Sequence, residues 1–161
     1  MRALGERARE DARVYFTGGV SAVLLGWRGS TIDVDLQLVP DRDELLRAIA
    51  ELKETLQLNV ELASPPHFIP ELPGWETRSV FIAREGRVSF YHYDFYSQAL
   101  AKIQRGHAQD RADVASMLAA GLVDRAGLRE LFEASADRLY RYPAVDPAAF
   151  RRAVEEVVSK G

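Results

Sequence analysis

The chain has 161 residues, of which 47% are hydrophobic and 28% charged. This composition excludes a disordered chain and is typical of a globular domain. Its 21 basic and 24 acidic residues give a net charge of −3, so no overall positive field attracts nucleic acid, and such a contact needs a local basic patch. The absence of cysteine excludes disulfides, thiolate metal sites and cysteine nucleophiles. No apolar run approaches the ~20 residues of a membrane span, and the first residues lack a signal peptide's apolar stretch, so we expect a cytoplasmic protein without membrane contact.

The first part of the chain alternates helix-forming and strand-forming segments. Residues 2–13 are rich in Ala, Arg and Glu, and residues 14–17 are β-branched or aromatic. Residues 31–39 follow a period-2 pattern, whereas residues 42–56 repeat leucine and isoleucine at helical spacing. We therefore expect, in chain order, a helix at residues 2–13, a strand at 14–17, a short helix at 20–27, a strand at 31–39, a helix at 42–56 and a strand at 59–63.

The second part begins with a proline-rich segment and ends in helices. Four prolines and a glycine at residues 64–75 predict an extended loop, because proline cannot donate to a sheet ladder. After it we expect a hairpin of strands 78–83 and 87–93, then helices at 97–105, 109–120, 125–140 and 147–159. The predicted fold class is α/β (α+β): a single domain of residues 1–161, with a small mixed sheet flanked by helices at 1–96 and a helical tail at 97–161.

Two aspartates in the strand at 31–39 form the first candidate site. Asp33 and Asp35 alternate with the apolar residues Ile32, Val34 and Leu36. Because successive strand residues point to opposite faces, we expect both carboxylates on one face and the apolar side chains in the core. Two neighbouring carboxylates repel each other unless a cation lies between them. Mg²⁺ is the expected cation, because it takes oxygen ligands and keeps water and substrate phosphates in its shell.

A glycine turn before the short helix forms the second candidate site. In the sequence Thr17-Gly18-Gly19-Val20-Ser21, the two glycines allow the backbone to approach a phosphate closely, and the following helix directs its N–H groups at it. We expect the Ser21 hydroxyl to donate to the same phosphates. A triphosphate cradle beside a metal-holding aspartate pair indicates nucleotidyl or phosphoryl transfer.

These motifs resemble a known family. Gly-Gly, a short helix ending in Leu-Leu-Gly, and Asp-x-Asp on the next strand resemble the DNA polymerase β-type nucleotidyltransferase superfamily. The segment GGVSAVLLGWRGSTIDVDLQL is similar to the head motif of CCA-adding tRNA nucleotidyltransferases, except that Ser21-Ala22 stand near the place of their Arg-Asp pair. Over residues 14–120 the chain is more similar to small bacterial nucleotidyltransferase-like proteins, including abortive-infection and toxin–antitoxin types.

The resemblance also draws attention to a lysine, an arginine and two aspartates in the helical tail. Lys102 and Arg105 lie three residues apart, so they share a helix face and can reach one anion together. Asp110 and Asp113 lie in the first turn of the next helix, where carboxylates are favoured. We expect nucleotide binding by Thr17, Gly18, Gly19, Ser21, Lys102, Arg105 and Asp110.

A polymerase-type site has a third carboxylate on a neighbouring strand. Asp94 is the first candidate, because it follows the apolar strand at 87–93, and Glu61 is the alternative. The resemblance thus implies metal binding by Asp33, Asp35 and Asp94, with Lys102 as a further catalytic residue.

The expected function is transfer of a nucleoside monophosphate from a nucleoside triphosphate, with Mg²⁺ or Mn²⁺, to a hydroxyl of an acceptor such as RNA, tRNA or a protein. A role in a toxin–antitoxin pair, with a cognate toxin or antitoxin as partner, follows from the same resemblance. The alternatives are a non-catalytic antitoxin or regulatory binding protein of the same fold and a small-molecule nucleotidyltransferase similar to those that adenylylate aminoglycosides.

Overall fold

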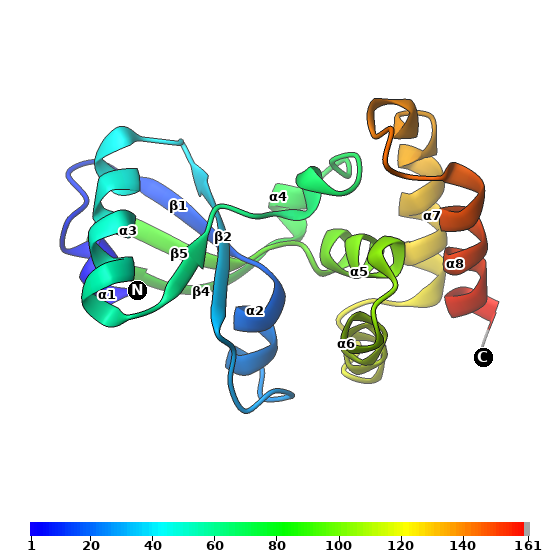
Figure 1. Cartoon of the computed structure of the whole chain (residues 1–161), viewed down its shortest axis with the longest axis horizontal. Coiled ribbons are helices and arrows are strands. Elements are labelled where there is room, and N and C mark those ends of the chain that lie inside the picture. Colours follow the sequence, from blue (N-terminus) through cyan, green and yellow to red (C-terminus); the bar gives the residue numbers. More distant parts are fainter. Residues whose placement is uncertain (160–161) are drawn as a thin grey trace. The chain divides into compact units, whose positions relative to one another are not determined.

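The computed structural model describes residues 1–159, and its contacts divide the chain into two compact units. The first unit comprises Met1–Ser64 and Ser79–Tyr93, and the second comprises Pro65–Arg78 and the residues from Asp94 onward. The first holds a mixed β-sheet with helices packed on it, and the second is helical (Figure 1). The structure therefore confirms the predicted fold class.

Five strands form the sheet of the first unit. They are β1 (Ala12–Phe16), β2 (Asp33–Val39), β3 (Asn59–Glu61), β4 (Val80–Glu85) and β5 (Val88–His92). Their order across the sheet is β3-β2-β1-β5-β4. Strand β1 is parallel to β5 and β2 is parallel to β3, whereas the β1–β2 and β4–β5 pairs are antiparallel. All five predicted strands are present, including the hairpin, with ends displaced by a few residues.

One face of this sheet is covered by helices α1 (Arg2–Gly5) and α3 (Asp43–Leu56). Alternate residues of the strands, among them Val14, Leu36 and Phe90, pack there against Leu45 and Ile49 of α3 in a continuous apolar core. Because successive strand residues point to opposite faces, the intervening residues lie on the other face. We call this other face the carboxylate face; its residues are Asp33, Asp35, Gln37 and Val39 of β2, Asn59 and Glu61 of β3, Arg13 and Tyr15 of β1, Ser89 and Tyr91 of β5, and Phe81 and Arg84 of β4.

Three segments of the first 78 residues differ from the sequence-based expectation. Helix α1 ends at Gly5 rather than at residue 13, because Ala12 already pairs with Val88 in the sheet and sheet pairing overrides helix propensity. Helix α2 (Gly18–Leu24) begins at the glycines themselves. The segment expected to be a loop contains a 3₁₀ turn, η1 (Pro65–His67), and helix α4 (Trp75–Arg78), because the fixed φ of proline is compatible with a tight helical turn.

The second unit contains the four predicted helices, with small changes at their ends. They are α5 (Phe95–Arg105), α6 (Ala108–Ala119), α7 (Arg125–Ala136) and α8 (Pro147–Ser159), and a 3₁₀ turn, η2 (Leu139–Arg141), replaces the last turn expected for α7. Helix α5 contacts α6, α7 and α8, and its residues Ala99 and Leu100 are fully buried. Within residues 1–159, none of the helices combines the length and hydropathy needed to cross a membrane.

Candidate active site

The glycine turn lies directly against the aspartate strand. The Thr17 N–H donates to the Asp35 carbonyl at 3.0 Å, which ties the end of β1 to β2. Gly18 then adopts a φ of +60°, and a Cβ built on it would lie 2.8 Å from Oδ2 of Asp35. A side chain at this position would therefore both strain the backbone and displace the carboxylate. The first two candidate sites of the sequence thus form one site.

Gly19 makes a second close approach to the same strand. A Cβ on Gly19 would collide with the hydroxyl of Thr31, which donates to the Asp33 carbonyl at 3.1 Å just before β2 begins. The two consecutive glycines therefore allow the first turn of α2 to pack on both ends of the Asp33–Asp35 segment.

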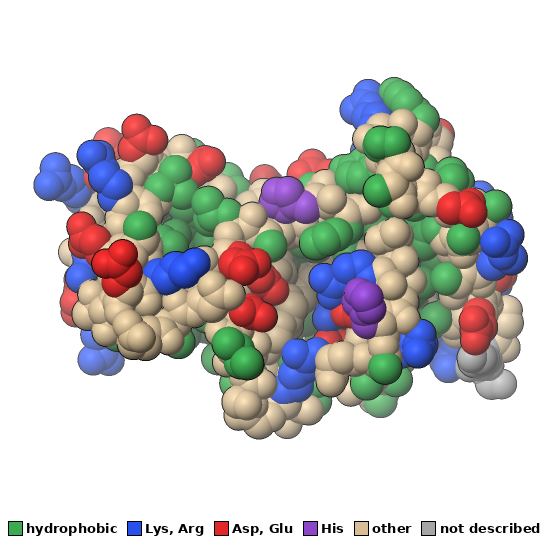
Figure 2. Space-filling view, viewed as in Figure 1, with side chains coloured by type: hydrophobic (Ala, Val, Ile, Leu, Met, Phe, Trp, Pro, Cys, Tyr) green, Lys and Arg blue, Asp and Glu red, His purple; other side chains and the backbone are tan. Residues whose placement is uncertain are grey.

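The aspartates have polar neighbours on strand β3. In the parallel pairing of β2 with β3, Asn59 lies beside Asp33 and Glu61 lies beside Asp35. The Asn59 side-chain amide donates to Oδ1 of Asp33 at 2.6 Å and to Oε1 of Glu61 at 3.1 Å. Asp33 is exposed and Asp35 is half-buried, and Figure 2 shows acidic side chains gathered over β2 and β3. No local pattern marks Asn59 as a site residue, because its place beside Asp33 depends on the strand register.

Thr17 and Ser21 use their hydroxyls within the first unit. The Thr17 hydroxyl donates to the Ala63 carbonyl at 3.3 Å. The fully buried Ser21 hydroxyl donates to the Phe16 carbonyl at 3.3 Å and lies 2.9 Å from Nδ1 of His92. Burial lowers the pKa of His92 below its ordinary value, because burial disfavours the charged ring. Both hydroxyls hold α2 in place, and their contact with a phosphate stays a prediction.

Lys102, Arg105, Asp110 and Asp113 form a compact charge cluster in the second unit. Nζ of Lys102 lies 2.7 Å from Oδ2 of Asp113 and 3.3 Å from Oδ1 of Asp110, and all three side chains are more than nine-tenths buried. The Arg105 guanidinium lies 2.6 Å from the same oxygen of Asp110. The grouping expected from the resemblance is present, and its charges are paired with one another. Phosphate binding by this cluster stays a prediction.

Asp94 lies in the second unit and carries several structural contacts. It is the N-cap of α5, where its carboxylate accepts hydrogen bonds from the N–H groups of Tyr96 and Ser97 and from the Ser97 hydroxyl. The Arg78 guanidinium makes a two-point ion pair with it at 3.0 and 2.8 Å. Asp94 is fully buried. Its role as a third catalytic carboxylate stays a prediction, whereas Glu61 lies next to Asp35 on the carboxylate face.

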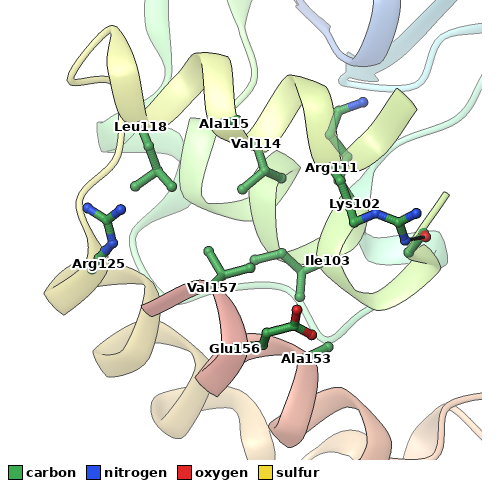
Figure 3. Close-up of a pocket in the computed structure, with 11 residues that line it drawn as sticks. Lys102, Ile103, Arg111, Val114, Ala115, Leu118, Arg125, Ala153, Glu156 and Val157 are labelled. Atoms are coloured by element: carbon green, nitrogen blue, oxygen red, sulfur yellow. Dashed lines mark hydrogen bonds between the residues drawn. The ribbon is translucent and has the colours of Figure 1, made fainter. Parts of the chain in front are cut away.

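The second unit also contains an apolar cavity of about 350 Å³ between α5, α6 and α8. Ile103, Val114, Leu118 and Val157 line it (Figure 3). Lys102 lines its edge and turns its amine away from these apolar side chains, toward its aspartate partners. The charged residues Arg111, Arg125 and Glu156 also line the cavity, so its lining combines apolar and charged side chains without the amine of Lys102.

A five-stranded mixed sheet with a glycine turn packed on an Asp-x-Asp strand is the arrangement that the resemblance to nucleotidyltransferases predicts. The chain belongs to the family described as nucleotidyltransferase of unknown function (DUF6036), whose model matches residues 2–159. This membership confirms the resemblance at the level of the nucleotidyltransferases. Comparison with curated proteins and with solved structures gave no match.

Proposed function

We propose that the protein is a Mg²⁺-dependent nucleotidyltransferase that moves a nucleoside monophosphate from a nucleoside triphosphate to an acceptor hydroxyl. The observation that carries the proposal is the packing of Gly18 against Asp35, so close that a Cβ built on Gly18 would lie 2.8 Å from Oδ2 of Asp35. This packing brings a backbone turn suited to phosphate within reach of a carboxylate suited to a metal ion. Membership of a nucleotidyltransferase family supports it.

The donor set around Asp33 fits Mg²⁺. Asp33, Asp35, Asn59 and Glu61 all offer oxygen atoms on one face of the sheet, and oxygen is the ligand that Mg²⁺ prefers. Within residues 1–159, no group of three or more His, Cys, Asp and Glu side chains is arranged to hold a metal ion. Protein sites for Mg²⁺ use one or two carboxylates and leave the other positions to water and substrate phosphates. Asp33 and Asp35 are therefore the proposed ligands.

The chemistry follows from the charges that develop during transfer. Bound Mg²⁺ would polarise the α-phosphate and neutralise the leaving pyrophosphate. The backbone at Gly18 and Gly19 would orient the triphosphate, because the absence of side chains allows a phosphate to approach the start of α2 closely. Asp33 and Asp35 would hold the metal beside that turn, since the Thr17 N–H donates to the Asp35 carbonyl.

For a third carboxylate we favour Glu61 over Asp94. Glu61 is exposed and lies beside Asp35 in the strand pairing, so it would be available to a metal bound by Asp35. Asp94 is fully buried and ion-paired with Arg78, and removing it from that pair leaves a buried charge unpaired. Alanine substitution of each, followed by measurement of Mn²⁺-dependent nucleotide binding, separates the two.

Lys102 and Arg105 are the proposed source of further positive charge for the phosphates, as the resemblance implies, with Asp110 positioning both. In the structure these cations pair with Asp110 and Asp113. A phosphate must therefore exchange with a carboxylate partner, and the partly exposed Arg105, with 34% of its side chain accessible, is better placed for that exchange than Lys102.

A second candidate function is nucleotide or partner binding without transfer, as in an antitoxin or a regulatory protein. The observation that favours it is that Lys102 pairs with Asp113 and Asp94 pairs with Arg78. Both ion pairs are structural contacts that occupy charges expected in the site. The acceptor in the first case is RNA, tRNA or a protein, and a cognate toxin or antitoxin is the partner in the second.

Incubation of the pure protein with each labelled triphosphate, Mg²⁺ or Mn²⁺, and bulk RNA or protein tests the proposal. We expect labelled acceptor with the wild type and none with Asp33→Asn or Asp35→Asn, while Asp41→Asn, an exposed acidic residue outside β2, serves as the matched control. Binding of the triphosphate without labelling of any acceptor would favour the second function. If the wild type neither binds a triphosphate nor labels an acceptor, the transferase and the nucleotide-binding form of the second function are both wrong, and only partner binding remains.

A further inference from the structure

We propose that the end of the carboxylate face remote from Asp33 and Asp35 binds single-stranded RNA and presents its terminal hydroxyl to the aspartates. The inference rests on the proposed function and adds the acceptor to it. Its residues, which we call the basic-aromatic patch, are Arg13, Phe81, Arg84 and Tyr91. They share the face with the aspartates, because each of them lies opposite another residue of the carboxylate face on the neighbouring strand.

Arg13, Arg84 and Tyr91 of the patch border a hollow of about 370 Å³ on the surface of the first unit. Arg13, Arg84, Ser89 and Tyr91 line it together with Asp11 and Pro40. A hollow of this size is within the ~300–1,000 Å³ range of sites that take a ligand group such as a nucleobase.

The aromatic residues of the patch form a supported stacking surface. Tyr91 stacks on the buried Tyr15 with ring centroids 5.1 Å apart and planes at 24°. Phe81 packs edge-on against Tyr91 at 5.6 Å and leaves 57% of its own surface exposed. Bases stack on such rings regardless of sequence, because every base has a π-face. An exposed phenylalanine on a supported aromatic row is thus suited to an unpaired base.

The charge of the patch is opposite to that of the whole chain. Among the residues that line the hollow, Arg13 and Arg84 each carry a positive charge and Asp11 carries a negative charge, within a chain of net charge −3. Nη2 of Arg84 lies 3.0 Å from Asp11, whose side chain is 70% exposed. Exposed ion pairs contribute little to stability, so a phosphate can replace Asp11 as the partner of Arg84.

The separation of the patch from the aspartates matches a short strand. Arg13 lies opposite Val39, four residues along β2 from Asp35, which corresponds to about 13 Å at ~3.3 Å per residue. Stacked nucleotides rise ~3.4 Å each along one strand. A strand held by the arginines therefore extends about four nucleotides before its end meets Asp33 and Asp35.

These features favour RNA over a protein acceptor. A protein surface is recognised through a fully buried apolar centre with a polar rim, whereas this patch combines arginines with separate aromatic faces. That combination is the one that single-stranded nucleic acid uses, with arginine on the phosphates and aromatic rings on the bases.

Fluorescence anisotropy with a labelled single-stranded RNA about 12 nucleotides long, within the ~4–16 nucleotides that such grooves cover, tests the inference. The measurement is made with the full chain in EDTA and without triphosphate, so that it does not depend on transfer. Arg84→Ala and Phe81→Ala remove the two kinds of contact, and Asp11→Asn removes the competing carboxylate. Arg47→Ala, an exposed arginine of α3 on the helix-covered side of the sheet, is the matched control.

We expect Arg84→Ala to weaken binding about 3- to 10-fold and to lower the slope of log affinity against log salt by about 0.7. Phe81→Ala weakens binding about fivefold or more without changing that slope. Asp11→Asn tightens binding, an effect that loss of structure cannot produce, and Arg47→Ala changes nothing.

Equal affinity for double-stranded RNA of the same length, or equal effects of Arg47→Ala and Arg84→Ala, would overturn the inference. So would triphosphate-dependent labelling of a protein by a chain that does not bind the RNA, and in that case the proposed function stands. RNA binding with the expected variant pattern but no transfer to any acceptor would support the patch as an RNA-binding surface, and would refute the proposed transferase together with the presentation of the hydroxyl to the aspartates.

Discussion

Replacement of Lys102 by methionine removes the cation at the centre of the charge cluster in the second unit. Nζ of Lys102 lies 2.7 Å from Asp113 and 3.3 Å from Asp110, and only 5% of its side chain is accessible. Methionine preserves the length and much of the apolar stem of lysine, so the change isolates the charge. Two buried carboxylates then lose their shared partner.

The structure sets the size of the effect. Removing one partner of a buried ion pair destabilises by about 3–5 kcal/mol, because the remaining charge is buried without compensation. Asp110 keeps the Arg105 guanidinium at 2.6 Å, and Asp113 keeps the weaker hydrogen bond from Gln109 at 3.3 Å. We therefore expect a loss of unfolding free energy of about 3 kcal/mol, at the lower end of that range. For a chain of this size the corresponding fall in Tm is about 6–12 °C.

Urea denaturation followed by far-UV circular dichroism measures this loss. Lys53→Met, which removes an exposed lysine of α3, is the matched control and should change the unfolding free energy by less than about 0.5 kcal/mol. A Lys102→Met protein as stable as the wild type, yet weakened in triphosphate binding, would refute the structural reasoning and identify Lys102 as a phosphate ligand.

Three further changes have expected outcomes. Gly18→Ala should lower the unfolding free energy by about 1–2 kcal/mol, because Gly18 has a left-handed backbone conformation. The same change should weaken Mn²⁺-triphosphate binding in calorimetric titration. Unchanged binding would mean that the glycine turn is not part of the triphosphate site. Burial raises the pKa of Asp110, but the hydrogen bonds and charges of Arg105 and Lys102 together outweigh burial and hold the pKa below its ordinary value. Its carboxylate therefore stabilises the fold above about pH 4 and loses this contribution as the pH falls through the lowered pKa, so Asp110→Asn should flatten the acid limb of a stability profile measured by urea denaturation. Phe132→Ala should cost about 3–5 kcal/mol in the same assay, since Phe132 is 2% exposed and packs edge-on against Phe150 at 4.9 Å; a loss below about 1 kcal/mol would mean that the site collapses around the smaller side chain.

The sequence predicted the strands and long helices because their patterns are local. Helix α3 repeats apolar residues at helical spacing, and β2 alternates Asp33 and Asp35 with Val34 and Leu36. The end of α1 was not predictable in the same way. Alanine and arginine favour helix there, and only the pairing of Ala12 with Val88 converts the segment to a strand.

The site was predictable where neighbours in sequence are neighbours in space. The glycine turn and the aspartate strand are separated by one short helix, so their contact follows from chain order. The position of Asn59 beside Asp33 and the burial of Lys102 depend on contacts between distant segments, which a single sequence does not encode locally. Lys102 therefore has the charge expected of a phosphate ligand, but in the folded chain its amine donates to Asp113.

Strand β2 supplies Leu36 and Leu38 to the apolar core and Asp33 and Asp35 to the opposite face. Deleting a single residue inside this strand would exchange the two sets and place the carboxylates against α3. The connection between Leu25 and Ile32 carries no such alternation, so length changes there leave the strand in register. Insertions and deletions among relatives of this chain should accordingly accumulate between α2 and β2 and be excluded from the seven residues of β2.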